Sequence, residues 1–392
     1  MRVIGLMSGT SYDAIDAAAA DLRIEDGQLV LTPLGLLSQP YPAALRASLA
    51  ESLPPATTTL EQVCRLDTGI GQAFASVAVQ AVEQLCGGQA DLIVSHGQTA
   101  FHWVDEGSVR GTLQLGQPAW IAEATGTAVV SDLRTRDVAA GGQGAPLVSI
   151  VDVLWLRGRP GTPVALNLGG IANITVVPAV DDPIAFDTGP ANALIDAVVR
   201  EVTAGEFAFD ADGVMAGRGQ IHPELFGRLL AEPYYARPAP KSTGKELFHL
   251  GYLAEAMTGL PPIEPDDLVA TVTALTARTV ADAVRAYGGT EVIAAGGGIR
   301  NPVLMHLLAE ELRGVRLLAT DELGMPSAAK EAYAFAVLGF LTVNGLGGTV
   351  PSCTGARHTS VLGSITPGAG PLPVSPRPKW APVGLRLDPG VV

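Results

Sequence analysis

The chain has 392 residues, and at about 150 residues per domain this length predicts two or three domains. Hydrophobic residues make up 47% and charged residues 16%, and the mean hydropathy is +0.30, so a generally disordered protein is excluded. Lys and Arg total 25 against 39 Asp and Glu. The resulting net charge of −14 argues against a protein that binds nucleic acid through clustered cations.

Cysteine spacing and apolar runs indicate the cellular setting. The three cysteines, Cys64, Cys86 and Cys353, are far apart and outside any CxxC spacing, which favours neither a disulfide framework nor a zinc site. The N-terminal apolar stretch is interrupted at Ser8, and the apolar run that begins at residue 332 is too short to span a bilayer. We therefore expect a cytoplasmic protein that binds no membrane.

The first part of the chain alternates predicted strands and helices. Apolar runs bounded by turn residues predict strands at 3–7, after Asp16, and at 29–36, 92–95, 112–115 and 128–132. Helical periodicity covers 43–53, 60–85 and 118–125. The Gly- and Ala-rich stretch 134–146 is predicted to be a loop, and we place the domain junction in it.

The second part opens in the same way, with a strand, a glycine turn and a returning strand. Strands are predicted at 164–168, 173–177, 184–187 and 292–295, and helices near Pro190 and over 265–287, 302–312 and 330–344. This repeated opening predicts an α/β protein with two similar domains, 1–140 and 141–368, followed by a Pro-rich tail at 369–392.

Three glycine-rich turns follow predicted strands, at 8–11, 169–170 and 296–298. A glycine turn brings backbone N–H groups close to a phosphate because no side chain intervenes. A single turn of this kind is most often only a turn. One turn in each domain favours two clamps on the same polyphosphate, and the third turn suits close approach of a nucleotide base and ribose.

Ten motifs, in order along the chain, resemble those of one family, the anhydro-N-acetylmuramic acid kinases, within the superfamily of sugar kinases, actin and chaperone ATPase domains. They are GLMSGTSYDAID (5–16), SHGQT (95–99), TLQLGQP (112–118), RTRDVAAGGQGAPLV (134–148), LNLGGIANIT (166–175), FDTGPANALID (186–196), PAPKSTGKE (238–246), GGGIRNP (296–302), KEAYAFA (330–336) and PSCTGA (351–356). The resemblance runs from residue 2 to about 368 and leaves only the tail outside it.

The resemblance implies two actin-like (ribonuclease H-like) α/β domains around a cleft for ATP and a sugar, in a homodimer that uses ATP and Mg2+. It implies an enzyme of peptidoglycan recycling that adds water across the 1,6-anhydro bridge of anhydro-N-acetylmuramic acid. The same enzyme would phosphorylate the 6-oxygen, giving N-acetylmuramic acid 6-phosphate and ADP.

The motifs also suggest roles for single residues. Asp187 in FDTGP matches the family's catalytic aspartate, the base for the attacking water, whereas a carboxylate before Gly-Pro is otherwise often a helix cap. The positions matched to ATP are Gly9, Thr10, Ser11, Tyr12, Asp13, Ala14, Ile15, Asp16, Gly169, Gly170, Gly297 and Gly298. The candidates for the sugar are His96, Arg134, Asp137 and Glu331. Arginine suits the lactyl carboxylate of a muramic acid through paired hydrogen bonds, with plain salt bridges as the alternative.

The chain departs from the family at a few positions. Ala14 and Ala191 stand where the family usually has glycine, which an alanine tolerates if its φ is negative. Met7 replaces an aspartate of the wider superfamily, and Asn167 is at the comparable place in the second turn, so the protein ligands of the metal stay unassigned. Two other functions remain open: a kinase for another anhydro sugar such as levoglucosan, and a non-catalytic actin-like ATP-binding protein.

Overall fold

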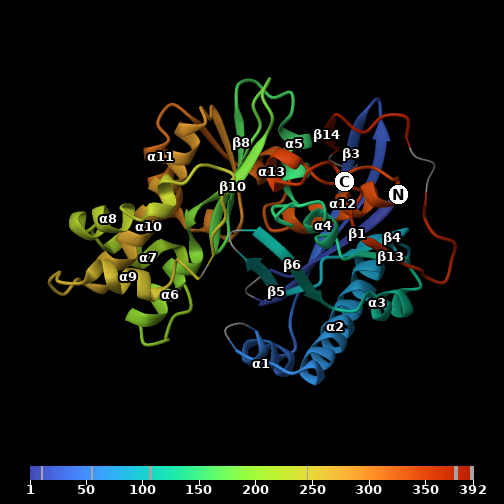
Figure 1. The fold of residues 1–392 in the computed structure, drawn as a ribbon, viewed down its shortest axis with the longest axis horizontal. Helices are drawn as coiled ribbons and strands as arrows, with labels where there is room; N and C mark the ends of the chain where they lie inside the picture. Colours follow the sequence, from blue (N-terminus) through green and yellow to red (C-terminus); the bar gives the residue numbers. More distant parts are fainter. Residues whose placement is uncertain (10–11, 54–55, 106–107, 245, 375–377, 389–392) are drawn as a thin grey trace. The chain divides into compact units, whose positions relative to one another are not determined.

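The computed structural model describes residues 1–9, 12–53, 56–105, 108–244, 246–374 and 378–388 (Figure 1). Contacts divide the chain into two compact units. Unit 1 comprises Met1–Trp155 and Ala329–Val392, and unit 2 comprises Leu156–Ala328. These boundaries differ from the expected junctions at residues 140 and 368, because the segment 329–368 packs with the N-terminal residues.

Unit 1 is built on a sheet whose strands lie in the order β13-β7-β4-β1-β2-β3-β14. Their bounds are β1 Arg2–Met7, β2 Ala14–Glu25, β3 Gln28–Pro40, β4 Leu92–Ser95, β7 Val129–Ser131, β13 Ser364–Thr366 and β14 Gly384–Leu387. The first three strands are antiparallel neighbours, and β4 and β7 run parallel to β1. The three opening strands are as predicted in order, although β2 and β3 extend well beyond the short runs expected.

Two helices pack on β1. Alternate residues of β1 join α2 (Leu60–Cys86) in one buried cluster. The helix α12 (Lys330–Val343) packs on β1, β2 and β4. It approaches Gly5 so closely that a Cβ there would stand 1.9 Å from the carbonyl oxygen of Ala332. A side chain at this position would displace α12, so Gly5 fixes the start of the helix that carries Glu331.

The remaining helices of unit 1 are short. They are α1 Ala43–Ser52, α3 Pro118–Thr125, α4 Thr135–Ala139, α5 Ser149–Leu156 and α13 Pro351–Thr354. The predicted loop at 134–146 is therefore partly wrong, because α4 lies within it before Gly141 turns the chain with a φ of +89°. A small separate sheet pairs β5 (Gln98–Asp105) with β6 (Ser108–Leu115), and its first strand was not predicted.

Unit 2 contains a sheet in the order β10-β9-β8-β11-β12. Its strands are β8 Pro163–Leu168, β9 Ile171–Val176, β10 Ile184–Pro190, β11 Glu291–Ala295 and β12 Arg316–Ala319. Its helices are α6 Asn192–Val202, α7 Val214–Arg218, α8 Pro223–Leu230, α9 Leu250–Met257, α10 Pro265–Ala286 and α11 Pro302–Glu311. Residues of α10 and α11 join alternate residues of the strands in one buried cluster, and α6–α9 form a second cluster with the start of α10.

The two units share one topology. In unit 2, β8, β9 and β10 are antiparallel neighbours, and β11 and β12 run parallel to β8. In unit 1 the strands β1, β2, β3, β4 and β7 have the same order and the same directions. A duplicated 3-2-1-4-5 sheet confirms the predicted actin-like α/β class.

Candidate active site

Asp187 lies on β10, at the edge of the unit 2 sheet, where a β-bulge shifts the register between Asp187 and Gly189. Three neighbours fix it. Its backbone amide donates to Lys241 O at 3.1 Å, its carbonyl accepts the Tyr234 hydroxyl at 2.7 Å, and its Oδ2 accepts the Thr243 amide at 2.9 Å. Among the described residues none donates a hydrogen bond to Oδ1, so this oxygen is free to accept a proton. Bulges of this kind often re-aim side chains at active sites.

Burial raises the pKa of Asp187 to about 6, with a smaller increase from Glu246 and an opposing effect of the Thr243 amide. A carboxylate with a pKa near 6 is largely ionised at neutral pH and still basic enough to take a proton from water in a transition state. The contact from Thr243 comes from the PAPKSTGKE motif, whereas Tyr234 lies before this motif and was not singled out by the sequence. Lys241 donates through Nζ to the carbonyls of Tyr234 and Tyr235, so it holds this segment together. Lys245, the other lysine of this motif, lies outside the described residues.

The second and third glycine turns meet at one end of the unit 2 sheet. The carbonyls of Gly169 and Gly170 accept the backbone amides of residues 191–193 at the start of α6. Asn192 donates through Nδ2 to Leu168 O at 2.9 Å, and its amide group lies beside Gly297 and Gly298. This arrangement brings together the predicted nucleotide residues Gly169, Gly170, Gly297 and Gly298.

The first glycine turn follows β1 in unit 1. Gly9 O accepts hydrogen bonds from the amide of Tyr12 and from Nε2 of Gln98, a side chain that is completely buried. The same Gln98 accepts the Ser8 and Tyr41 hydroxyls through Oε1. Gln98 therefore anchors this turn, a role that the SHGQT motif signalled without assigning. Thr10 and Ser11 lie outside the described residues.

The other residues predicted at this turn have mixed surroundings. Asp13 is exposed and pairs with Arg46, and half-buried Asp16 accepts the Ser38 hydroxyl at 2.6 Å. The side chain of Ile15 is in the core, so only its backbone can face a ligand. Neither Ala14 nor Ala191 has a positive φ, and that of Ala191 is −136°, so both alanines fit where the family has glycine.

In unit 1, His96 and Arg134 form a direct pair. The Arg134 Nε donates to His96 Nε2 at 2.9 Å, and Arg134 Nη1 donates to Gly144 O at 2.7 Å. His96 is buried, lies 2.8 Å from Gly97 O through Nδ1, and packs its ring against Phe335 of α12 at 4.7 Å. Burial and the neighbouring guanidinium hold the pKa of His96 well below its usual range, so the imidazole is neutral.

The other two sugar candidates differ in exposure. Asp137 is fully buried, and its carboxylate accepts the Gly144 amide and the Thr354 hydroxyl, both at 2.8 Å. Glu331 is exposed at the start of α12 and interacts electrostatically with Arg134. The structure therefore brings His96, Arg134 and Glu331 together, whereas Asp137 holds the chain segment that carries Gly144.

One buried ion pair was not foreseen. Lys330, the first residue of α12, pairs with Asp152 of α5 at 2.7 Å, and both side chains are almost completely buried. Breaking a buried ion pair is costly because it leaves an unpaired buried charge. The pair between Lys330 and Asp152 therefore holds the first turn of α12 against α5. Together with Gly5 it fixes the backbone beside Glu331.

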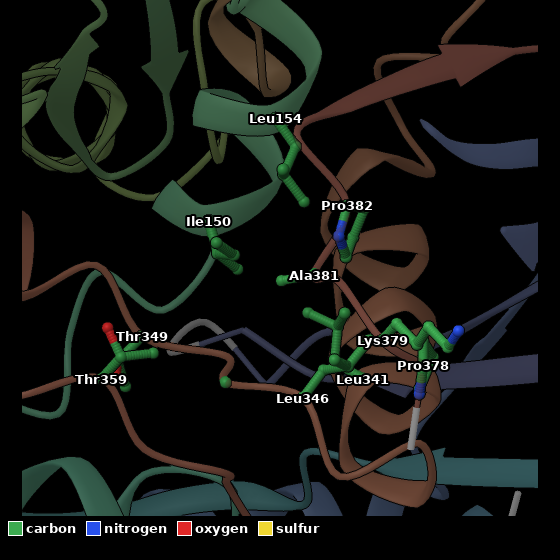
Figure 2. Close-up of a pocket in the computed structure, with 11 residues that line it drawn as sticks. Ile150, Leu154, Leu341, Leu346, Thr349, Thr359, Pro378, Lys379, Ala381 and Pro382 are labelled. Carbon is green, nitrogen blue, oxygen red and sulfur yellow. The ribbon is translucent and has the colours of Figure 1, made fainter. Parts of the chain in front are cut away.

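Unit 1 also contains a cavity of about 550 Å3, away from the predicted site residues (Figure 2). Its walls come from α5, the end of α12, the segment around Thr349 and Thr359, and the tail. Aliphatic side chains such as Ile150 and Leu154 point into it (Figure 2). Within the described ranges, no three His, Cys, Asp or Glu side chains gather as a metal site, and no helix has the length and apolar character needed to cross a bilayer.

Two units that share one strand order, each with a glycine turn after its first strand, define the class of actin-like ATPases and sugar kinases. The chain belongs to the anhydro-N-acetylmuramic acid kinase family, whose model matches residues 1–368. The resemblance seen in the motifs is thus confirmed, and the protein is an enzyme of the kinase class.

Relatives named anhydro-N-acetylmuramic acid kinase are similar over nearly the whole chain. The relative in Streptomyces avermitilis is 66% identical over 388 residues, which cover 99% of this chain and 100% of the relative. That in Rhodococcus erythropolis is 62% identical over 397 residues, with 99% and 100% covered. A more distant relative in Caldanaerobacter subterraneus is 40% identical over 381 residues, with 93% and 96% covered.

Proposed function

We propose that the protein is an ATP-dependent kinase that opens the 1,6-anhydro bridge of anhydro-N-acetylmuramic acid and phosphorylates the 6-oxygen. The products are N-acetylmuramic acid 6-phosphate and ADP, and the reaction belongs to cell-wall sugar recycling in the cytoplasm. The observation that carries this proposal is the Asp187 carboxylate in a chain of this family, because one of its oxygens is held by Thr243 and the other accepts no hydrogen bond from a described residue.

The reaction needs one base and one electrophile. Asp187 takes a proton from water as the water oxygen bonds to C1 of the sugar, and the bond between C1 and the 6-oxygen breaks. The released 6-oxygen then bonds to the γ-phosphorus of ATP, and ADP leaves. The two halves are coupled because the 6-oxygen is an ether, with no proton and little nucleophilicity, until the ring opens.

The glycine turns are the groups that we assign to ATP. Gly9, Gly169 and Gly297 have no positive φ, and among the described residues a Cβ on any of them would have no contact closer than 3.5 Å. Neither backbone conformation nor internal packing requires glycine there, whereas close approach of a phosphate or ribose does. We also propose that the enzyme uses Mg2+, an ion that usually takes one or two carboxylates and completes its shell with phosphate oxygens and water. Its protein ligands stay unassigned.

Arg134 favours a carboxylated sugar over levoglucosan. The guanidinium is half-buried and uses Nε and Nη1 inside the protein, and in the described part of the chain no hydrogen bond is formed by Nη2, although Glu331 interacts electrostatically with the group. A cation held this way suits the lactyl carboxylate that levoglucosan lacks. We also propose that the enzyme acts as a homodimer, which sedimentation velocity would test.

The test of the catalytic role is the substitution Asp187→Asn, which keeps the volume and the acceptor for the Thr243 amide but removes the base. We expect turnover to fall by at least about two orders of magnitude, with ADP release and sugar phosphorylation lost together. In the wild type, kcat/KM should rise with pH through about 6, the pKa of Asp187, and then level off because the ionised form is active.

The matched control is Asp182→Asn, since Asp182 is an exposed carboxylate shortly before the same strand. It should leave turnover unchanged. In 18O-labelled water the wild-type product should carry one label at the anomeric hydroxyl and none in the phosphate. Label in the phosphate, or near-normal phosphorylation by the Asp187→Asn enzyme, would show that this mechanism is wrong and make Glu331 the next base to test.

A further inference from the structure

The hydrogen bonds of His96 determine which of its nitrogens carries the proton. Nδ1 lies 2.8 Å from the carbonyl oxygen of Gly97, which can only accept, so Nδ1 must be protonated. The imidazole is neutral, so Nε2 then carries a lone pair. This is the nitrogen that faces Arg134 Nε at 2.9 Å, and a guanidinium can only donate. These two contacts therefore favour the tautomer with the proton on Nδ1.

The His96 imidazole is held from two sides, by the Gly97 carbonyl and by Phe335. The backbone carbonyl of Gly97 lies in a turn with a φ of +70°, where a Cβ would stand 2.5 Å from Leu115 O, so this residue cannot readily be replaced. On the other side Phe335 packs on the imidazole, and Phe335 lies one helical turn after Glu331 on α12. The imidazole is therefore fixed in orientation before any substrate binds.

The same contacts determine which edge of Arg134 is free. Nε is used by His96, which excludes a paired contact through the Nε and Nη2 edge. Gly144 O takes one of the two Nη1 hydrogens, which leaves three N–H groups, two on Nη2 and one on Nη1. Asp137 keeps Gly144 in place for this contact, because its completely buried carboxylate accepts the Gly144 amide.

We propose that His96 is a positioning residue. Its neutral imidazole accepts the Arg134 Nε hydrogen and so holds the guanidinium with the edge formed by Nη1 and Nη2 toward the carboxylate of the sugar. This inference rests on the proposed function and deepens it, because it makes His96 a determinant of specificity for carboxylated sugars without contact to the sugar itself. A lysine-like freely rotating cation would attract the carboxylate with less geometric selectivity.

The test compares two substrates and two variants. The substrates are anhydro-N-acetylmuramic acid and 1,6-anhydro-N-acetylglucosamine, which has the same ring without the lactyl group. His96→Leu removes the acceptor, and His96→Gln keeps one in its side-chain oxygen. In His96→Leu we expect the preference for the lactyl sugar, as the ratio of kcat/KM values, to fall roughly ten- to hundredfold, mainly through KM. His96→Gln should recover much of this preference.

Equal losses on both sugars, or no recovery in His96→Gln, would overturn the proposal and leave His96 a packing residue. A second measurement does not depend on turnover or on the stability of the leucine variant. In protein labelled with 15N-histidine, the His96 signals should show a protonated Nδ1 and a bare Nε2 from pH 8 down to pH 6, with His96→Gln identifying the signals. A protonated Nε2 in this range would also refute the proposal.

The two arms separate this inference from the proposed function. If the wild type phosphorylates neither sugar, the proposed function fails, and the 15N signals still decide whether His96 accepts from Arg134. If the wild type phosphorylates the lactyl sugar and His96→Leu keeps its preference, the proposed function stands and the positioning role fails.

Discussion

The glycines of the predicted nucleotide turns differ in what the fold itself requires of them. Gly296 has a φ of +90°, and a Cβ on Gly298 would stand 2.7 Å from the Leu168 side chain, so both are needed to bring β8 and β11 together. Gly9, Gly169 and Gly297 have neither constraint. We therefore predict that Ala at 9, 169 or 297 weakens ATP binding about tenfold or more while the melting temperature stays within about 2 °C of the wild type.

Calorimetric titration with ATP and a thermal melt check this prediction. Gly227→Ala in α8 is the matched control, because its Cβ also enters open space, far in sequence from any nucleotide turn, and it should leave ATP affinity unchanged. A melting temperature that drops as far in Gly169→Ala as in Gly298→Ala would instead mean that packing explains both positions. Normal ATP affinity in all three variants would remove these turns from the nucleotide site.

The sequence singles out candidate site residues, but it says little about the contacts that each of them makes. Asp187, His96, Arg134 and Glu331 stood out because they lie in motifs, but residue type alone does not distinguish a contact with substrate from a contact with backbone. Asp137 illustrates the limit: its neighbours Thr354 and Gly144 are separated from each other by over 200 residues, so its burial depends on tertiary packing. The tautomer of His96 likewise depends on where one carbonyl lies.

At the scale of elements, the tail adds a strand that the sequence did not predict. β14 pairs in parallel with β3 from Gly384 to Leu387, and Leu385 is buried there. Two ion pairs flank the strand, Arg23 with Asp388 at 2.8 Å and Arg386 with Glu25 at 3.3 Å, but exposed pairs add little stability. The strand therefore acts mainly by covering the edge of β3, an exposed template for pairing with other chains.

Deletion of residues 369–392 is expected to lower the melting temperature by about 4 °C or more and to promote self-association, because it exposes Leu385's partners and the β3 edge. Thermal melts and light scattering measure both effects. Leu385→Ala should reproduce part of the loss of stability, whereas Val383→Ala, at an exposed position next to the strand, should not. A deletion variant that stays monodisperse with an unchanged melt would show that β3 needs no cover.

Other elements show why prediction by pattern succeeded or failed. The helices α2 and α10 were found because burial on one side gives them an apolar period. The helix α12 and the strands β4 and β11 were found as continuous apolar runs, because they are buried on nearly all sides. The strand β5 was missed because it pairs only with β6 and exposes Phe101 and Trp103, so its alternation is not that of a half-buried strand. The helix α4 was missed because five residues are too few to show a helical period.

At the scale of the whole molecule, the duplicated topology places equivalent turns in different units. Gly9 follows the first strand of the unit 1 sheet, and Gly169 follows the first strand of the unit 2 sheet. The chain crosses between the units after Trp155 and again after Ala328. We predict hinge motion between the units, because a phosphate held by both turns would draw them together.

The last prediction concerns this motion. If the phosphates of one ATP contact both the Gly9 turn and the Gly169 turn, as we propose, binding favours arrangements in which the two turns are a few ångströms from the same ligand. We predict that ligand binding then shifts a protein that samples several arrangements toward the more closed ones, and that the sugar adds a constraint of the same sign. Small-angle scattering should therefore show a smaller radius of gyration with a non-hydrolysable ATP analogue and sugar than without ligands, and an intermediate value with either alone.

The Gly169→Ala variant should lose the response of the radius of gyration to the nucleotide and keep the response to the sugar. An unchanged radius of gyration with both ligands at saturating concentration would show that the two turns do not close on one ligand. In that case the units would already have their ligand-bound arrangement before any ligand binds.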